Sequence, residues 1–132
     1  MIAMKDLAEK LSAVERRISD ARGEFTLFGL FQVEAAPNFW HLVVAASWAD
    51  AETTLPVLKY MDRELKKDLT IDELVKISRI VILPADFEEL EELAEEHPVE
   101  HGKVIVRNRE FGLQTIEKAY LITCRPPVVK AA

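Results

Sequence analysis

The chain has 132 residues, of which 49% are hydrophobic and 30% charged, and its formal net charge is −6 at pH 7. This length is typical of a single domain, and the composition lies outside the ranges of disordered, collagen-like and low-complexity chains. A negative net charge repels nucleic acid and anionic lipid, so either partner would require a concentrated basic surface.

Neither the apolar segments nor the single cysteine indicates a membrane or an oxidising compartment. The longest apolar run, 39–49, is interrupted by His41 and Ser47 and is shorter than the ~20 residues that cross a bilayer. Residues 1–22 alternate charged and apolar side chains, which is not the pattern of a signal peptide. Cys124 has no second cysteine with which to form an internal disulfide. We therefore expect a cytoplasmic protein that has no membrane contact.

The first third of the chain predicts a helix followed by a β-hairpin. Apolar residues spaced three and four apart form one helical stripe over 4–21, and Gly23 is the expected stop. The stripe also fits a short heptad pattern, which a second copy of the chain could cover. Residues 24–34 and 39–48 are predicted as two strands joined by a turn over 35–38, with Phe25 and Leu27 on one face of the first strand. In the second strand Trp40 and Trp48 share one face and His41 lies on the other.

The middle and end of the chain predict helices that alternate with three more strands. A helix is expected over 54–68, and Thr70 with Glu73 has the spacing of a capping box that begins a further short helix. Residues 79–83, which are apolar after Arg79, predict a buried strand in the interior of the sheet. Asp86 with Glu89 suggests a second capping box, for a helix that ends before Pro98. Residues 102–109 and 113–124 predict a closing hairpin.

These elements define the expected fold. Residues 1–132 form a single α+β domain in the order α-β-β-α-(α)-β-α-β-β. We expect a mixed, largely antiparallel five-stranded sheet packed against three to four helices. The sequence shows no internal repeat and no domain linker.

The densest polar feature is an acidic helix within 86–101, where eight acidic residues occur without a Lys or Arg. Such a run usually forms a solvated face, although it could also dock a basic protein partner. Nearby, His97, Glu100 and His101 have side chains of the types that bind zinc or nickel. Because Pro98 prevents these residues from lining up on one helix, they are metal candidates only and we expect no cofactor.

Three residues are candidates for a catalytic or ligand-binding site. His41 lies in an apolar strand, where its imidazole could act as an acid or base or could simply pack in the sheet. Arg107 and Arg109 stand at alternate positions of one predicted strand and should share a face with Lys103 and Ile105. Recognised catalytic and phosphate-binding motifs are absent from the sequence.

The sequence leaves three functional hypotheses open. The first is a non-catalytic protein-interaction or regulatory module that forms a homodimer through the heptad-like stripe or the apolar hairpin faces. The alternative is a ligand-binding domain or small enzyme, whose pocket between sheet and helices would use His41, Trp40 or Trp48, and Arg107 or Arg109. Nucleic-acid binding through the basic C-terminal hairpin is a further alternative, which the negative net charge disfavours.

Overall fold

The computed structural model describes residues 3–36, 39–112 and 114–126. Its elements are α1 (Met4–Arg22), β1 (Phe25–Val33), β2 (Trp40–Ala46), α2 (Ser47–Asp50), α3 (Thr54–Asp68), α4 (Ile71–Lys76), β3 (Ile77–Ile82), α5 (Glu88–Glu96), β4 (Val104–Phe111) and β5 (Gln114–Cys124). They form a five-stranded sheet in the order β3-β2-β1-β5-β4, in which β2 and β3 run parallel and the other pairs antiparallel. The predicted α+β fold and both hairpins are confirmed. Pro37, Asn38 and Leu113, which we placed in a turn and at the start of a strand, lie outside the described residues.

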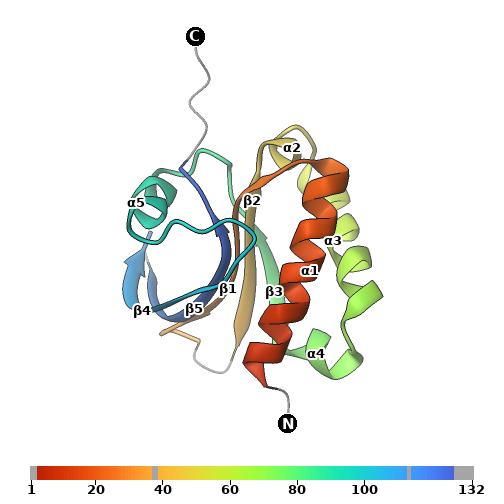
Figure 1. The fold of residues 1–132 in the computed structure, drawn as a ribbon, viewed down its shortest axis with the longest axis horizontal. Helices are drawn as coiled ribbons and strands as arrows, with labels where there is room; N and C mark the ends of the chain where they lie inside the picture. Colours follow the sequence, from red (N-terminus) through yellow and green to blue (C-terminus); the bar gives the residue numbers. More distant parts are fainter. Residues whose placement is uncertain (1–2, 37–38, 113, 127–132) are drawn as a thin grey trace.

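Helices α1 and α3 cover one face of the sheet (Figure 1). The predicted stripe of α1 is buried there, with Leu7, Leu11 and Ile18 fully inaccessible, and Gly23 ends the helix. Ion pairs attach this helix to its neighbours, since Lys10 contacts Glu73 at the start of α4. Apolar packing therefore holds helix α1 against the sheet, and ion pairs link it to the other helices. No helix in the described part of the chain is both long and apolar enough to cross a membrane.

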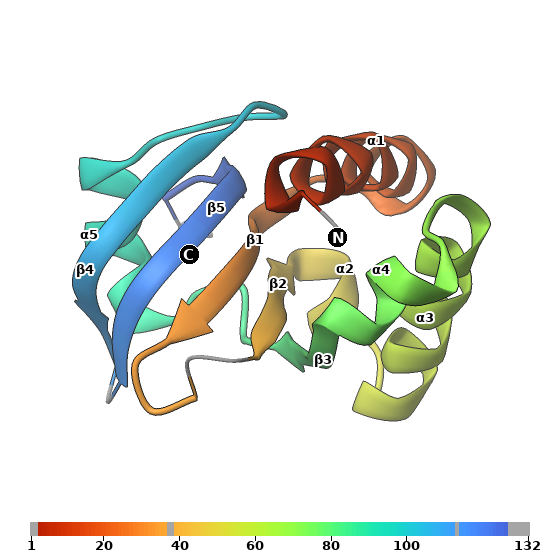
Figure 2. The same cartoon turned by 90° about the horizontal axis from the view of Figure 1, so that it is seen from below.

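Helix α5 covers only part of the opposite face (Figure 2). Its buried residues Leu90, Leu93 and Ala94 pack with Val106 of β4 and Leu121 of β5. A helix is about 10 Å across, while neighbouring strands lie about 4.8 Å apart, so one helix covers about two strands. The α5 face of β2 and β3 is consequently left without a helix above it.

Strand β3 corrects our prediction that 79–83 is interior to the sheet. It is an edge strand that pairs with β2 alone, and Ser78 and Arg79 are exposed. The apolar run is nevertheless real, because Ile80 and Ile82 pack into one core while Val81 packs into the other. An apolar run shows that a strand carries apolar side chains on both faces. It does not show whether the strand has hydrogen-bonding neighbours on both sides.

Two local details of the sequence prediction also need correction. Phe87, not Asp86, occupies the N-cap position of α5, so the capping box expected there is wrong, whereas the one at Thr70 and Glu73 is present. In β1 the register shifts between Phe25 and Leu27, and these two side chains enter opposite cores instead of one face. A β-bulge adds one residue to a strand and thereby reverses the alternation on which a face assignment depends.

The first prediction tests the α1 stripe. Leu11→Ala should lower the free energy of unfolding by about 2–5 kcal/mol, because it leaves a cavity at a fully buried position. Leu55→Ala is the matched control, since Leu55 lies in α3 but is 60% exposed, and its cost should be below about 0.5 kcal/mol. Urea denaturation of both variants measures the difference. Equal losses would show that α1 does not pack as described.

Candidate functional site

The uncovered part of the α5 face contains a pocket of about 500 Å³. Strands β1, β2 and β3 form its floor, and the start of α5 and the β4–β5 turn form its walls. The lining residues are Phe31, Val33, His41, Val43, Arg79, Val81, Leu83, Phe87, Glu89, Phe111, Gly112, Gln114 and Ile116. The volume falls within the range of small-molecule sites, about 300–1,000 Å³.

Three aromatic rings from distant parts of the chain build one wall of the pocket. The ring centroid of Phe111 lies 5.8 Å from that of Phe31 in β1 and 5.6 Å from that of Phe87 before α5. Gly112 follows Phe111 in the β4–β5 turn with a φ of +64°, a conformation that glycine adopts without strain. The wall therefore joins three segments that are not neighbours in sequence.

His41 and Arg79 are the basic groups of the pocket and lie side by side. They are partners in the parallel pairing of β2 with β3, so their side chains meet at the same level of the sheet. Burial lowers the pKa of His41, and the positive charge of Arg79 lowers it further. His41 is consequently a neutral imidazole at neutral pH and offers one N–H donor, while Arg79 carries the positive charge.

The other residues that we predicted for a sheet pocket are not brought to this one. Trp40 and Trp48 lie on the opposite face, in the core beneath α1 and α3. Arg109 contacts Glu96 of α5 at 3.0 Å and thus faces α5, but it does not line the pocket. Arg107 follows Val106, which is buried toward α5, and therefore projects to the other side of the sheet.

The expected common face of Lys103, Arg107 and Arg109 is wrong because of Asn108. This residue has a φ of +50°, which interrupts the alternation of β4 between the two arginines. The basic residues of the last hairpin are thus divided between two faces of the sheet, with Arg109 paired to the acidic helix.

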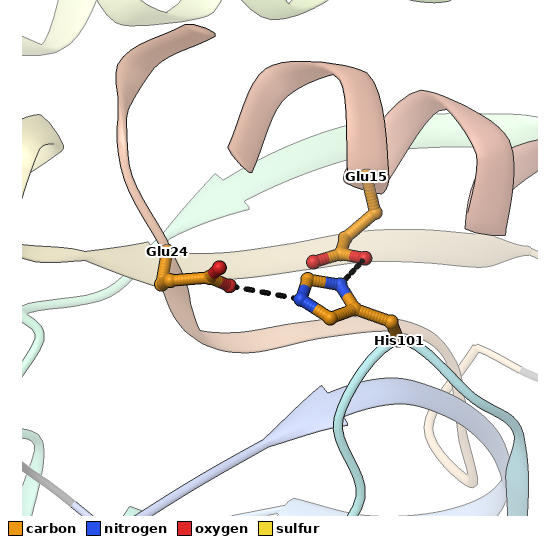
Figure 3. A group of neighbouring side chains, drawn as sticks. All are labelled: Glu15, Glu24 and His101. Atoms are coloured by element: carbon orange, nitrogen blue, oxygen red, sulfur yellow. Dashed lines mark hydrogen bonds and ion pairs between the residues drawn. The ribbon is translucent and has the colours of Figure 1, made fainter. Parts of the chain in front are cut away.

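The predicted metal candidates are also separated. His97 lies 4.0 Å from Glu96, and Glu100 contacts Arg125, whereas His101 joins a different group. His101 lies between Glu15 of α1 and Glu24 in the α1–β1 loop (Figure 3). Sequence analysis missed this group because Glu15 and His101 are 86 positions apart.

The Glu15–His101–Glu24 cluster places one imidazole between two carboxylates. Glu15 is completely buried and accepts hydrogen bonds from Ser19 and Thr123 as well as the 2.7 Å contact of His101 Nδ1. His101 Nε2 lies 3.0 Å from Glu24 Oε2. Each ring nitrogen of His101 thus faces one carboxylate, and an imidazole with both nitrogens protonated would donate to both.

These three side chains could in principle hold a divalent cation, because one ligand atom from each lies within 4.8 Å of the others. Both nitrogens of His101 already face carboxylates, and Arg125 contacts Glu24 at 2.8 Å. These side chains are therefore already used in a network of polar contacts, which links the loop around residue 101 to α1. We assign it a structural role.

Cys124, the one thiol of the chain, is buried at the end of β5. Burial raises the pKa of this thiol to about 12, and the nearby Arg109 guanidinium offsets only part of that effect. Cys124 is consequently a protonated core residue at neutral pH and not a nucleophile.

Comparison of the chain with known proteins finds no relative. No protein-family model, no curated protein and no solved structure matches the chain. The function has to be argued from the geometry of the pocket and of the cluster.

The second prediction concerns the electrostatics of the pocket. Arg79→Gln should raise the pKa of His41, because it removes a positive charge that disfavours the imidazolium. The pKa should still lie below the ordinary value of about 6.5, since burial is the larger cause of the depression. An NMR titration of the imidazole C–H resonances measures both values, with His41→Gln to assign the signal. Arg107→Gln, on the opposite face, should leave the titration unchanged.

The third prediction concerns the Glu15–His101–Glu24 cluster. His101→Ala should lower the free energy of unfolding by about 3 kcal/mol, because it leaves the buried carboxylate of Glu15 without its imidazole partner. Adding Glu15→Gln should recover part of this loss, since a neutral amide needs no counter-charge. Lys66→Ala breaks the exposed pair with Asp62 and should cost below about 0.5 kcal/mol. Strict additivity of the two substitutions at 15 and 101 would contradict the pairing.

Proposed function

We propose that this chain is a non-catalytic regulatory module that binds a small, largely apolar molecule in the pocket beside α5. The observation that carries the proposal is the composition of the lining, in which eight of thirteen residues are apolar. Sites for small molecules are typically concave and apolar with a few polar groups that orient the ligand. His41, Arg79, Glu89 and Gln114 are such polar groups here.

The shape of the fold supports a permanent pocket. Its floor consists of three hydrogen-bonded strands, and the wall residue Phe111 belongs to a fourth. Asp50 accepts hydrogen bonds from the backbone N–H of Ala85 at 3.0 and 3.3 Å, which anchors the segment between β3 and α5. A ligand would therefore meet a largely preformed site and would not have to order the chain on binding.

The formation of a homodimer and the binding of a basic protein partner at the acidic helix stay predictions. The heptad-like stripe that suggested self-association is buried within the chain by the sheet and α3. In the acidic helix, Glu96 is paired with Arg109, while Glu91, Glu92 and Glu95 are exposed. The exposed carboxylates form the solvated face that such a run usually provides.

The fourth prediction tests ligand binding with the neutral fluorophore N-phenyl-naphthylamine. Its fluorescence should rise when it is titrated with the protein, because the dye leaves water for an apolar site. Val81→Phe should weaken this binding at least tenfold, since the larger side chain fills the floor of the pocket and suits a strand.

The matched control is Val75→Phe, a change of the same size at a position of α4 that is 74% exposed. It should bind the dye as the unmodified protein does. Thermal unfolding checks that both variants are folded. A folded Val81→Phe variant with unchanged dye affinity, or the absence of dye binding to the unmodified protein, would refute the pocket as a ligand site.

A further inference from the structure

The hydrogen-bond donors of the pocket lie together at one end of the sheet. His41 and Arg79 belong to the first residues of β2 and β3, and Gln114 is the first residue of β5. Strand β1 ends at the same edge, since its residue Val33 pairs with Ile116. One end of the pocket thus presents a guanidinium, an imidazole N–H and an amide N–H, while the aromatic wall lies beside them.

Arg79 has no ion-pair partner among the described residues, although it borders an apolar cavity. Arg17 is paired with Glu64 and Asp68 and Arg109 with Glu96, whereas the exposed Arg16, Arg63 and Arg107 have no ion pair among the described residues either. Arg79 differs from those three in lining a pocket. A guanidinium presents its N–H groups in a planar fork that matches a carboxylate. The unpaired charge at the mouth of the pocket is therefore complementary to an anionic group.

We infer that the ligand of this pocket is an apolar molecule with a single carboxylate, whose anionic group binds Arg79 with help from His41 and Gln114. This inference rests on the proposed function and names the ligand class for the same site. The apolar body of the ligand packs on Val43, Val81 and the ring of Phe111, and its carboxylate stays at the exposed edge beside β3. Such a placement leaves the charged group hydrated in part, which avoids the cost of burying it.

Among the described residues that line the pocket, Glu89 is the one carboxylate, and it belongs to the first turn of α5. Its charge opposes that of an anionic ligand. If the ligand is a carboxylate, removing the charge of Glu89 must tighten binding, whereas removing the charge of Arg79 must weaken it. The two substitutions therefore have effects of opposite sign on an anion and no effect on a neutral molecule of the same shape.

The fifth prediction uses naphthylacetate and its neutral amide, naphthylacetamide, as a matched pair of probes. Both are titrated against the dye-loaded protein, and displacement of N-phenyl-naphthylamine reports their affinities. Naphthylacetate should bind about tenfold more tightly than the amide. Arg79→Gln should abolish this preference, Glu89→Gln should increase it about threefold, and Arg107→Gln, on the other face, should leave it unchanged.

The outcomes separate the inference from the proposed function. Equal affinities for acid and amide, or a preference that survives Arg79→Gln, would overturn the carboxylate inference while dye and amide binding still support a ligand pocket. Failure of the dye and both probes to bind would overturn the proposed function and the inference together. Because Arg79 is exposed and has no ion-pair partner among the described residues, its replacement should leave the unfolding temperature unchanged.

Discussion

The sheet has apolar side chains on both faces, and helices cover these two faces unequally. Two long helices, α1 and α3, bury the first face, where Leu7, Leu11 and Phe28 are completely inaccessible. The second face receives α5 alone, a helix about 10 Å across, whereas five strands at about 4.8 Å spacing extend over about 19 Å. The mismatch cannot be removed by packing α5 more tightly. It leaves an apolar concavity over β1, β2 and β3, and the aromatic wall around Phe111 bounds it.

Most of the fold could be predicted because the spacing of apolar residues along a segment shows which face of its helix or strand is buried. The stripe of α1, the start of α3 near Thr54 and the capping box at Thr70 depend on residues within a few positions of one another. The errors arise where the structure depends on contacts between distant segments or on one irregular backbone position. The edge position of β3 depends on the order of the strands in the sheet. The pattern of apolar and polar residues does not give that order. The different faces of Phe25 and Leu27, and of Arg107 and Arg109, each follow from a single irregular backbone position.

The candidate site could be predicted only in fragments. His41 was recognisable as a titratable group in an apolar strand, but Arg79 was read as part of a buried strand, and its position beside His41 follows from the parallel pairing of β2 and β3. Phe31, Phe87 and Phe111 come together from three segments, so no spacing in the sequence marks them. The same holds for His101, whose chemical partners are Glu15 and Glu24 instead of the neighbouring His97 and Glu100.

The Glu15–His101–Glu24 cluster and the polar residues of the pocket differ in whether the folded chain supplies their interaction partners. Within the Glu15–His101–Glu24 cluster both carboxylates contact the imidazole, Glu24 also contacts Arg125, and the buried carboxylate of Glu15 has two hydroxyl donors, so the folded chain satisfies the group by itself. At the pocket the reverse holds, because Arg79 has a charge without an ion-pair partner among the described residues and the apolar floor beside it lacks a covering helix. A second molecule that is apolar over most of its surface and anionic at one end would satisfy both needs at once. That complementarity, and not the greater density of titratable groups in the cluster, is why we assign function to the pocket and stability to the cluster.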